Sequence, residues 1–249
     1  MNKPESNERT YYRHARVEPY LQRIIVSHQY RLIYCPIPKA ACTTWKTVLN
    51  PGRAVTESYH IHGSRPGFVA LSTLPLGDRS RVLDSYFKFT FVRHPLSRLL
   101  SVYKDKFELA SAKPSTVPYR FWRGYAEHIK EAVLDGGYCD TTWRDLTFQE
   151  FARFVCHQQP AWMNEHWHPQ HLLLGGLKYD FVGRLERLRP DSAYVCSKVG
   201  LPWPLPGQEQ VGIAKTGAGA LLDDYYTPEL EALVTEKFRQ DFDQLGYHL

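Results

Sequence analysis

The fold of this chain is constrained most by two runs of apolar and β-branched residues. Each run is followed at once by a basic loop and then by a helical pattern. They are YRLIY (30–34), which leads into CPIPKAACTTWKTVL (35–49), and YFKFTFV (86–92), which leads into RHPLSRLL (93–100). Aromatic and β-branched residues are typical of strands in a sheet. Strands that alternate with helices predict an α/β fold with a mainly parallel central sheet flanked by helices.

Further helices and one more strand are expected in the second half of the chain. TFQEFARFVCH (147–157) and the tail TPELEALVTEKFRQDFDQLGY (227–247) place their apolar residues on one helical face. The tail follows a Thr-Pro start and precedes Gly246, so we expect one helix between them. YDFVG (179–183) predicts a short strand.

The length of 249 residues suits a single domain, residues 1–249, with a substantial core. Within it, residues 1–16 are a polar lead-in. Residues 111–146 are irregular in composition, and we interpret them as an insertion that forms part of an acceptor site.

Composition excludes several classes of protein. The net charge of +5 is mild, and Lys and Arg are spread along the chain, which suits an anionic ligand in a cleft better than a nucleic acid. No apolar run reaches the roughly 18–20 residues that a membrane helix needs, and the first residues are too polar for a signal peptide. The five cysteines lack metal-type spacing and are interpreted as free thiols in a reducing, cytoplasmic compartment.

The loop after the first strand has the chemistry of a phosphate site. A strand, a tight loop and a helix N-terminus direct backbone N–H groups and the positive helix end to one point. Lys39 adds a charge, and Thr43 and Thr44 add hydroxyl donors. The loop lacks the glycines of the Walker pattern, which disfavours a Mg²⁺-dependent NTPase. An ordinary strand–helix connection with an exposed lysine is the alternative.

The loop after the second strand offers a second anion site. Arg93 ends the strand, and Ser101 lies eight residues later in the predicted helix. Arg93 and the Ser101 hydroxyl can bind one phosphate group between them. The alternative is structural, with Arg93 and Arg98 paired to Asp84 or Asp105. Together the two loops predict a ligand with a phosphate-like group at each of two neighbouring strand ends.

The two motifs resemble the paired signatures of sulfotransferases that use 3′-phosphoadenosine-5′-phosphosulfate (PAPS). PKAACTTWK is similar to their 5′-phosphosulfate loop, and FVRHPLSRLLSVYKDKF is similar to their 3′-phosphate motif. The Golgi carbohydrate sulfotransferases that act on chondroitin and dermatan are the most similar branch. Four further segments match this family in the same order along the chain, so the resemblance covers residues from about 24 to 247. They are VSHQYRLIYC, NEHWHPQHLL, YDFVGRLERLRPDSAYV and DFDQLGY.

The resemblance implies a P-loop-like sulfotransferase fold, PAPS as donor, 3′-phosphoadenosine 5′-phosphate (PAP) as product and no metal. The donor residues that it implies come from both loops and from two later segments: Lys39, Ala40, Ala41, Cys42, Thr43, Thr44, Trp45, Arg93, Ser101, Arg184 and Lys215. Two roles stay open for Trp45, stacking on a base or packing. Lys215 of AKTG (214–217) lies between Gly212 and Gly217 and suits a loop that closes over the 3′-phosphate.

The chain departs from animal members of this family in two respects. Those members begin with a membrane anchor and carry paired cysteines after the HW segment, where this chain reads LLLGGLKYD (172–180). Both differences favour a cytoplasmic, bacterial relative, and they leave the identity of the acceptor open.

Histidine is the residue expected to take the proton from the attacking hydroxyl. SYHIHGSR places His60 and His62 after the first helix, where the related enzymes also carry histidines, and His60 is our first candidate. NEHWHPQH offers His166 as the second candidate, with a role either as base or in holding the acceptor. The spacing of these histidines matches no zinc motif.

Two other functions remain open. A sulfotransferase for a small phenol, alcohol or lipid needs an apolar acceptor pocket, whereas residues 111–170 are mixed in character, with many basic and aromatic residues. A non-catalytic protein that binds PAP would keep the phosphate sites and need no base. The presence of Lys39 and of the histidine candidates favours a catalytic protein with a carbohydrate hydroxyl as acceptor.

Overall fold

The computed structural model of this protein describes residues 21–49, 69–108, 122, 124–131, 146–205 and 216–248. The chain forms two compact units, each built from two separate stretches of sequence. The first unit comprises Met1–Val92 and Gln170–Ile213, and the second comprises Arg93–Pro169 and Ala214–Leu249. The expectation of a single domain stays a prediction, and each unit is described by itself below.

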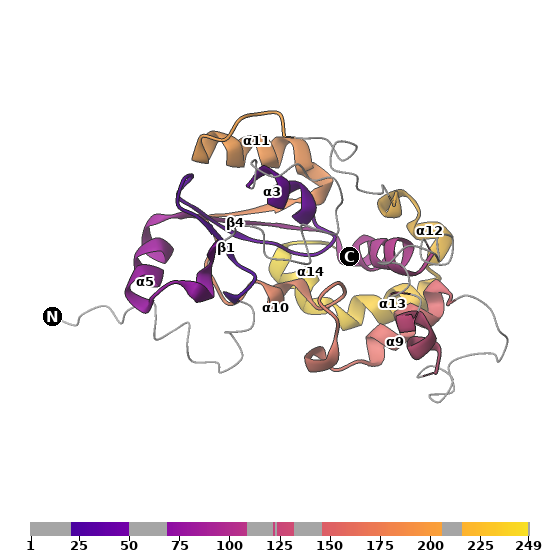
Figure 1. The fold of residues 1–249 in the computed structure, drawn as a ribbon. Helices are drawn as coiled ribbons and strands as arrows, with labels where there is room; N and C mark the ends of the chain where they lie inside the picture. The colour runs from indigo at the N-terminus through magenta and orange to yellow at the C-terminus, as the bar shows by residue number, and fades with distance from the viewer. Residues whose placement is uncertain are drawn as a thin grey trace. The chain divides into compact units, whose positions relative to one another are not determined.

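A five-stranded sheet forms the centre of the first unit, in the order β3-β1-β2-β4-β5 (Figure 1). The strands are β1 (Ile25–Ser27), β2 (Leu32–Cys35), β3 (Val69–Ala70), β4 (Phe87–Val92) and β5 (Phe181–Arg184). β2, β4 and β5 are parallel to one another, while β1 is antiparallel to both β2 and β3. Because β3 opposes β1, it runs in the direction of β2, so β1 alone is reversed. The prediction of a mainly parallel sheet in an α/β fold is confirmed.

Helices cover both faces of this sheet (Figure 1). On one face, α3 (Cys42–Val48) and α11 (Leu188–Val199) bury an aromatic core in which Trp45 lies against Phe89 and Phe91. On the other face, α5 (Leu76–Ser85) and α10 (Gln170–Leu173) enclose an aliphatic core. Buried side chains on both faces of the central strands explain why β2 reads as a continuous apolar run rather than as an alternation.

The register of the parallel strands brings their carboxyl ends to one edge of the sheet. Cys35 pairs with Thr90, and Val92 pairs with Arg184. The loop that contains Lys39 follows β2, and Arg93 follows β4 directly along the chain. Ligands of open α/β sheets bind at this edge, where loops and helix N-termini meet.

The second unit is helical in its described part. Its helices are α6 (Pro95–Tyr103), α9 (Phe148–His157), α12 (Leu222–Tyr225), α13 (Pro228–Lys237) and α14 (Arg239–Leu245), and residues 124–131 are helical as well. α6 starts with Pro95 in its first turn, as expected, and continues into a π-helical turn, η2 (Lys104–Glu108). α9 starts with a capping box between Thr147 and Glu150.

The tail differs from the expected single helix, because the structure divides it into α13 and α14. Phe238 lies between the two helices with φ −105° and ψ 18°, outside the helical region. Its side chain is buried, as are Val234 before it and Phe242 after it. Apolar periodicity indicates which residues face the core, but it does not show where a helix is interrupted. The same periodicity continues across a break when both helices pack against one core. α14 ends at Gly246 in the left-handed conformation, as predicted.

No helix in the described residues is both long enough and apolar enough to cross a bilayer.

Gly183 of β5 should not tolerate a larger side chain. A Cβ atom at this position would lie 2.6 Å from Cε1 of Phe91, whose ring is fully buried. We expect Gly183→Ala to lower the free energy of unfolding by about 1–3 kcal/mol through overpacking, measured by urea denaturation. Gly77→Ala is the control: Gly77 lies in α5, and a Cβ atom there would meet nothing within 4 Å, so stability should be unchanged or slightly higher. An unchanged midpoint for Gly183→Ala would contradict this view of the packing.

Candidate functional site

The loop between β2 and α3 has a strained backbone conformation that its residue types do not predict. Lys39 has φ 68° and Ala41 has φ 60°, and neither is a glycine. Ala40 N–H donates to the Ile37 carbonyl at 3.2 Å, which tightens the turn, and Ala41 is the N-cap residue of α3. Left-handed backbone at non-glycine residues costs about 1 kcal/mol or more at each position and is concentrated at functional sites. The loop therefore has the sharp turn of a phosphate-binding loop without its glycines.

The first residues of α3 are firmly packed beneath this loop. Thr43 and Thr44 are buried, and Thr47 Oγ1 donates to the Thr43 carbonyl at 2.9 Å. Trp45 is fully buried, with its ring centroid 4.7 Å from that of Phe89. Of the two roles left open for Trp45, packing is the one that the structure shows. Cys42, at the start of the helix, is buried as well.

Burial changes the ionisation of the groups around the loop. It raises the pKa of the Cys35 thiol to about 11, so that the thiol stays protonated, and Cys35 Sγ–H donates to the Leu173 carbonyl at 3.3 Å. Burial lowers the pKa of the Lys46 ammonium, and the nearby Arg23 acts in the same direction. The Lys46 ammonium and the Arg23 guanidinium thus lie close enough to repel each other.

Arg93 and Ser101 both belong to the second unit. Arg93 lies two residues before α6, and Ser101 lies at the end of the second turn of α6. Arg93 Nε–H donates to Ser97 Oγ at 3.2 Å, and Ser97 Oγ–H donates to the His94 carbonyl at 3.2 Å. These bonds hold the Arg93 side chain against the start of the helix. Ser101 is buried, and Thr216 Oγ1–H donates to its hydroxyl at 3.1 Å. Thr216 follows Lys215 in the sequence, and it is Thr216 that contacts α6 at Ser101.

The chain after Thr216 is anchored to the same helix at two further points. Tyr226 donates to the Leu96 carbonyl at 3.0 Å, and Tyr225 donates to Glu108 Oε1 at 2.7 Å. Lys104 Nζ lies 2.7 Å from Glu108 and donates to the Tyr225 hydroxyl at 2.9 Å. Thr216 was missed by sequence reasoning, because it is 115 residues from Ser101 and no pattern links them.

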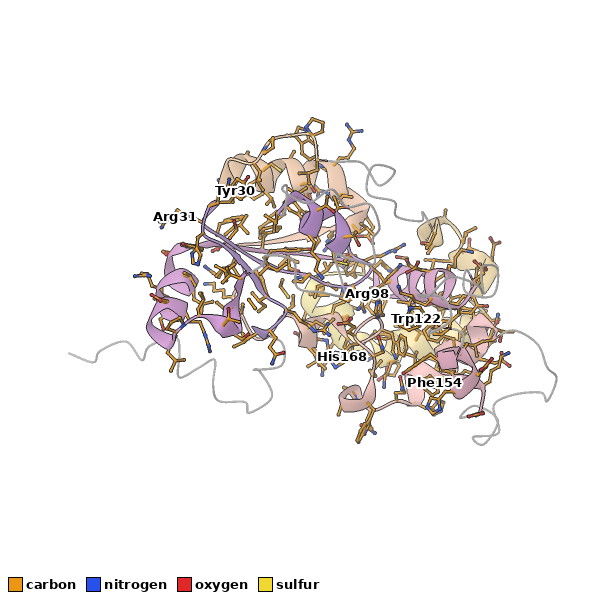
Figure 2. The ribbon with its side chains drawn as sticks, viewed as in Figure 1. Tyr30, Arg31, Arg98, Trp122, Phe154 and His168 are labelled. Atoms are coloured by element: carbon orange, nitrogen blue, oxygen red, sulfur yellow. The ribbon has the colours of Figure 1, made fainter. Side chains whose placement is uncertain are left out.

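Arg98 connects α6 to the segment that carries the second histidine candidate (Figure 2). Its guanidinium is buried and donates from Nη1 to the His168 carbonyl at 2.9 Å and from Nη2 to the Glu165 carbonyl at 3.2 Å. Asp105, one of the two aspartates considered as partners in the structural alternative, forms an ion pair with Lys106 at 3.1 Å. Arg98 therefore fixes residues 165–168 against the helix of Ser101.

His166 has a defined ring orientation. Its Nδ1 lies 2.7 Å from Asn164 Oδ1, and its backbone N–H donates to the same oxygen at 3.0 Å. The ring meets Trp122 edge to face at a centroid distance of 5.2 Å. Such a ring, oriented by one hydrogen bond and one aromatic contact, is typical of a histidine with a chemical role. His168, by contrast, is buried.

Arg184 ends β5, next to Val92 in the sheet, so it lies at the edge where the donor was expected. Its backbone N–H donates to Asp191 Oδ2 at 2.8 Å, which fixes the strand end against α11. Three predicted site residues, His60, His62 and Lys215, lie outside the described residues. Their roles stay predictions.

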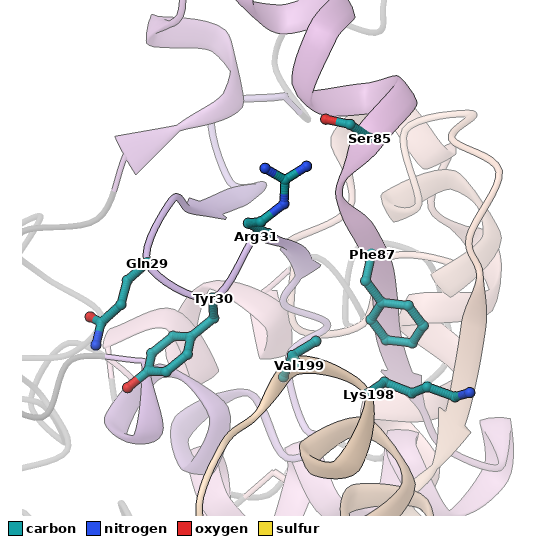
Figure 3. A pocket seen from close by; sticks show the side chains of 7 residues that line it. All are labelled: Gln29, Tyr30, Arg31, Ser85, Phe87, Lys198 and Val199. Atoms are coloured by element: carbon teal, nitrogen blue, oxygen red, sulfur yellow. The ribbon is translucent and has the colours of Figure 1, made fainter.

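A hollow of about 400 Å³ lies at the opposite edge of the sheet, where β2 and β4 begin (Figure 3). Its cations are Arg31 and Lys198, and Tyr30, Phe87 and Val199 give it apolar walls. Arg31 lies over the Tyr86 ring at 5.2 Å, and Lys198 lies over the Tyr194 ring at 5.3 Å. None of the predicted site residues lines this hollow, so it is separate from the candidate site.

Comparisons with known proteins agree with the geometry. Residues 22–248 match the sulfotransferase family. The chain is 34% identical over 241 residues to carbohydrate sulfotransferase 14 of Danio rerio, covering 92% of this chain and 63% of that protein. It is 36% identical to carbohydrate sulfotransferase 14 of Homo sapiens, covering 73% and 48% of the two chains, and 32% identical to carbohydrate sulfotransferase 11 of Danio rerio, covering 72% and 53%.

The chain thus spans between about half and two thirds of the length of these relatives. No solved structure is significantly similar to it. A match along nearly the whole chain, together with the loop after β2 and the helix after β4, identifies the protein: it belongs to the sulfotransferase family.

Proposed function

We propose that the protein transfers a sulfuryl group from PAPS to a hydroxyl group of a carbohydrate. The observation that supports this most directly is the pair of left-handed residues, Lys39 and Ala41, in the loop after β2 of a sulfotransferase-family chain. A loop held in this conformation directs backbone N–H groups toward one point, which suits an anionic group. The matched relatives are carbohydrate sulfotransferases, which favours a sugar hydroxyl over a small phenol as acceptor.

Two groups of residues would bind the donor. Lys39 and the loop that follows it would hold the 5′-phosphosulfate. Arg93 and Ser101 would hold the 3′-phosphate, with Thr216 as an additional hydroxyl donor next to Ser101. Lys215, the residue before Thr216 in the sequence, is the further residue that we propose for the 3′-phosphate. Bidentate arginine contacts and hydroxyl donors are typical of phosphate recognition.

The reaction is an in-line displacement at sulfur. The acceptor oxygen forms a bond to sulfur while the bond between sulfur and the bridging phosphate oxygen breaks, and PAP leaves with the electron pair. Negative charge grows on that oxygen, so a cation at Lys39 would stabilise the transition state more than the ground state. The hydroxyl proton passes to a histidine. The other task of the protein is to align acceptor and donor.

His60 and His166 remain the two candidates for the base. A specific observation favours His166: its ring is held by Asn164 and Trp122, on a segment that Arg98 fixes to α6. A base must be held in place, because proton transfer requires hydrogen-bond distance to the attacking hydroxyl. We therefore assign the base to His166 and give His60, which follows the loop helix in sequence, a role near the acceptor or the donor.

Selective binding of PAP tests the proposal. We expect the protein to bind PAP more tightly than AMP, measured by isothermal titration calorimetry, because AMP lacks the 3′-phosphate. Arg93→Ala should weaken PAP binding by about 2–4 kcal/mol if Arg93 makes a charge-assisted contact, and should leave AMP binding almost unchanged.

Arg81→Ala is the matched control. Arg81 is an exposed arginine on α5 that pairs with Asp78 at 2.7 Å, and its loss should affect neither ligand. Equal affinity of the wild-type protein for PAP and AMP would contradict the proposed donor site.

A further inference from the structure

The contacts of His166 determine which of its ring nitrogens carries the proton. Asn164 Oδ1 lies 3.0 Å from the His166 backbone nitrogen, and a backbone N–H can only donate. The Asn164 atom must therefore be its carbonyl oxygen, since an amide NH₂ group would place two donors face to face. The same oxygen lies 2.7 Å from His166 Nδ1, so Nδ1 must carry a hydrogen. The lone pair of the neutral ring is then on Nε2.

We propose that Asn164 is a positioning residue that holds His166 as the Nδ1-protonated tautomer, with Nε2 as the proton acceptor of the sulfuryl transfer. This inference rests on the proposed function, because it assigns a partner to the proposed base. A histidine base needs its second nitrogen to be held by a hydrogen-bond acceptor, which sets both the tautomer and the direction of the lone pair.

The main chain around Asn164 makes this a rigid arrangement. The Asn164 carbonyl accepts the N–H groups of Trp167 at 3.1 Å and His168 at 2.8 Å, which closes a turn over the histidine. Arg98 holds the carbonyls of Glu165 and His168. The side chain and the main chain of Asn164 thus fix the two ends of the same turn, and the ring has little freedom to rotate.

The neutral partner has a consequence for ionisation. A carboxylate beside Nδ1–H would stabilise the imidazolium and raise the pKa of the histidine, whereas an amide oxygen orients the ring with a much smaller effect. Among the described residues, the charged groups of this segment and its contacts are Glu165, Arg98, which holds the Glu165 and His168 carbonyls, and Lys106, whose Nζ lies 5.1 Å from the centre of the Trp122 ring and pairs with Asp105. Asn164 therefore orients the ring without adding a charge beside Nδ1.

Nitrogen NMR tests the tautomer without reference to activity. The full-length protein would be labelled with ¹⁵N-histidine, and the His166 resonances would be assigned by their loss in His166→Gln. We expect the wild-type ring at pH 8 to show a protonated Nδ1 and an unprotonated Nε2. In Asn164→Ala the ring should show a mixture of the two tautomers.

Kinetics test the link to the reaction. Asn164→Ala should lower kcat roughly 3–10-fold, the rate equivalent of one neutral hydrogen bond, with unchanged affinity for PAP. Asn164→Asp keeps both bonds to His166 and adds a charge, so the acidic limb of the pH–rate profile should move up by about one pH unit. A residue that only stabilised the turn would not produce this movement.

Gln158→Ala is the matched control on the same segment. Gln158 Oε1 accepts the Trp167 Nε1–H at 2.8 Å, so its loss should lower stability while the midpoint of the acidic limb stays in place. The proposal is overturned if wild-type His166 carries its proton on Nε2, or if Asn164→Asp leaves the acidic limb where it was.

The experiments distinguish failure of the role proposed for Asn164 from failure of the proposed function itself. If the protein transfers no sulfuryl group from PAPS to any carbohydrate, the function fails, although the NMR result can still show that Asn164 fixes the tautomer. If transfer occurs and both Asn164 variants keep the wild-type profile, the function stands and the role of Asn164 is wrong.

Discussion

Lys39→Ala should lower kcat about 10²–10³-fold, the loss seen when a single electrostatic donor to a developing negative charge is removed. Lys39 is the only basic residue of the loop Pro38–Ala41, and its left-handed backbone fixes where its side chain leaves the chain. The lysine would contact the bridging oxygen in the ground state as well, so PAP binding should weaken by a smaller factor. Turnover with radiolabelled PAPS and calorimetry with PAP measure the two effects separately.

Two further variants define the role of this charge. Lys39→Arg keeps the cation in a different shape and should recover only part of the rate, because a guanidinium is not equivalent to an ammonium at a single oxygen. Lys178→Ala removes an exposed lysine elsewhere in the first unit and should have wild-type kinetics. If Lys39→Ala weakens PAP binding and leaves kcat unchanged, the lysine serves binding alone.

His166→Ala should lower kcat roughly 10²–10⁴-fold and leave PAP affinity intact, the pattern expected for loss of a general base. The wild-type rate should fall as the pH drops through a pKa near 6–7, because protonation of the histidine removes the acceptor of the hydroxyl proton. This acidic limb should be absent in His166→Ala. The measurement is the pH dependence of kcat at saturating PAPS.

His60→Ala decides between the two candidate bases. If His60 acts near the acceptor or the donor, its loss should change KM for one of them and keep the acidic limb. The opposite pattern, a vanished acidic limb in His60→Ala and a retained one in His166→Ala, would return the role of base to His60.

The strands and the two basic loops could be predicted because they depend on local sequence. A run of aromatic and β-branched residues such as Phe87–Val92 strongly favours a buried strand. The proline at the start of α6 indicates the first turn of that helix. The division of the tail at Phe238 could not be predicted, because α13 and α14 share one apolar periodicity.

The details of the candidate site depend on contacts that sequence spacing does not contain. Lys39 and Ala41 have left-handed backbone conformations although neither is a glycine, so their residue types did not predict these conformations. The hydroxyl pair of Ser101 and Thr216 joins residues 115 positions apart. Arg98 binds backbone carbonyls of a segment some 70 residues away, and such backbone acceptors cannot be recognised from residue types in a sequence.

The division of the sheet between two stretches of the chain has a consequence for biosynthesis. β5 pairs with β4 although the first stretch of the second unit, Arg93–Pro169, lies between them in the sequence, and Asp180 accepts the Lys88 N–H from 92 residues away. A ribosome that has released β4 still has to synthesise more than 80 residues before β5 can cover its exposed edge. Unpaired strand edges in nascent chains are prone to aggregation. The helices α6 and α9 pack against α13, which is synthesised later still. Both units therefore depend on contacts between distant stretches of the chain, and the last parallel strand is expected to join the sheet late.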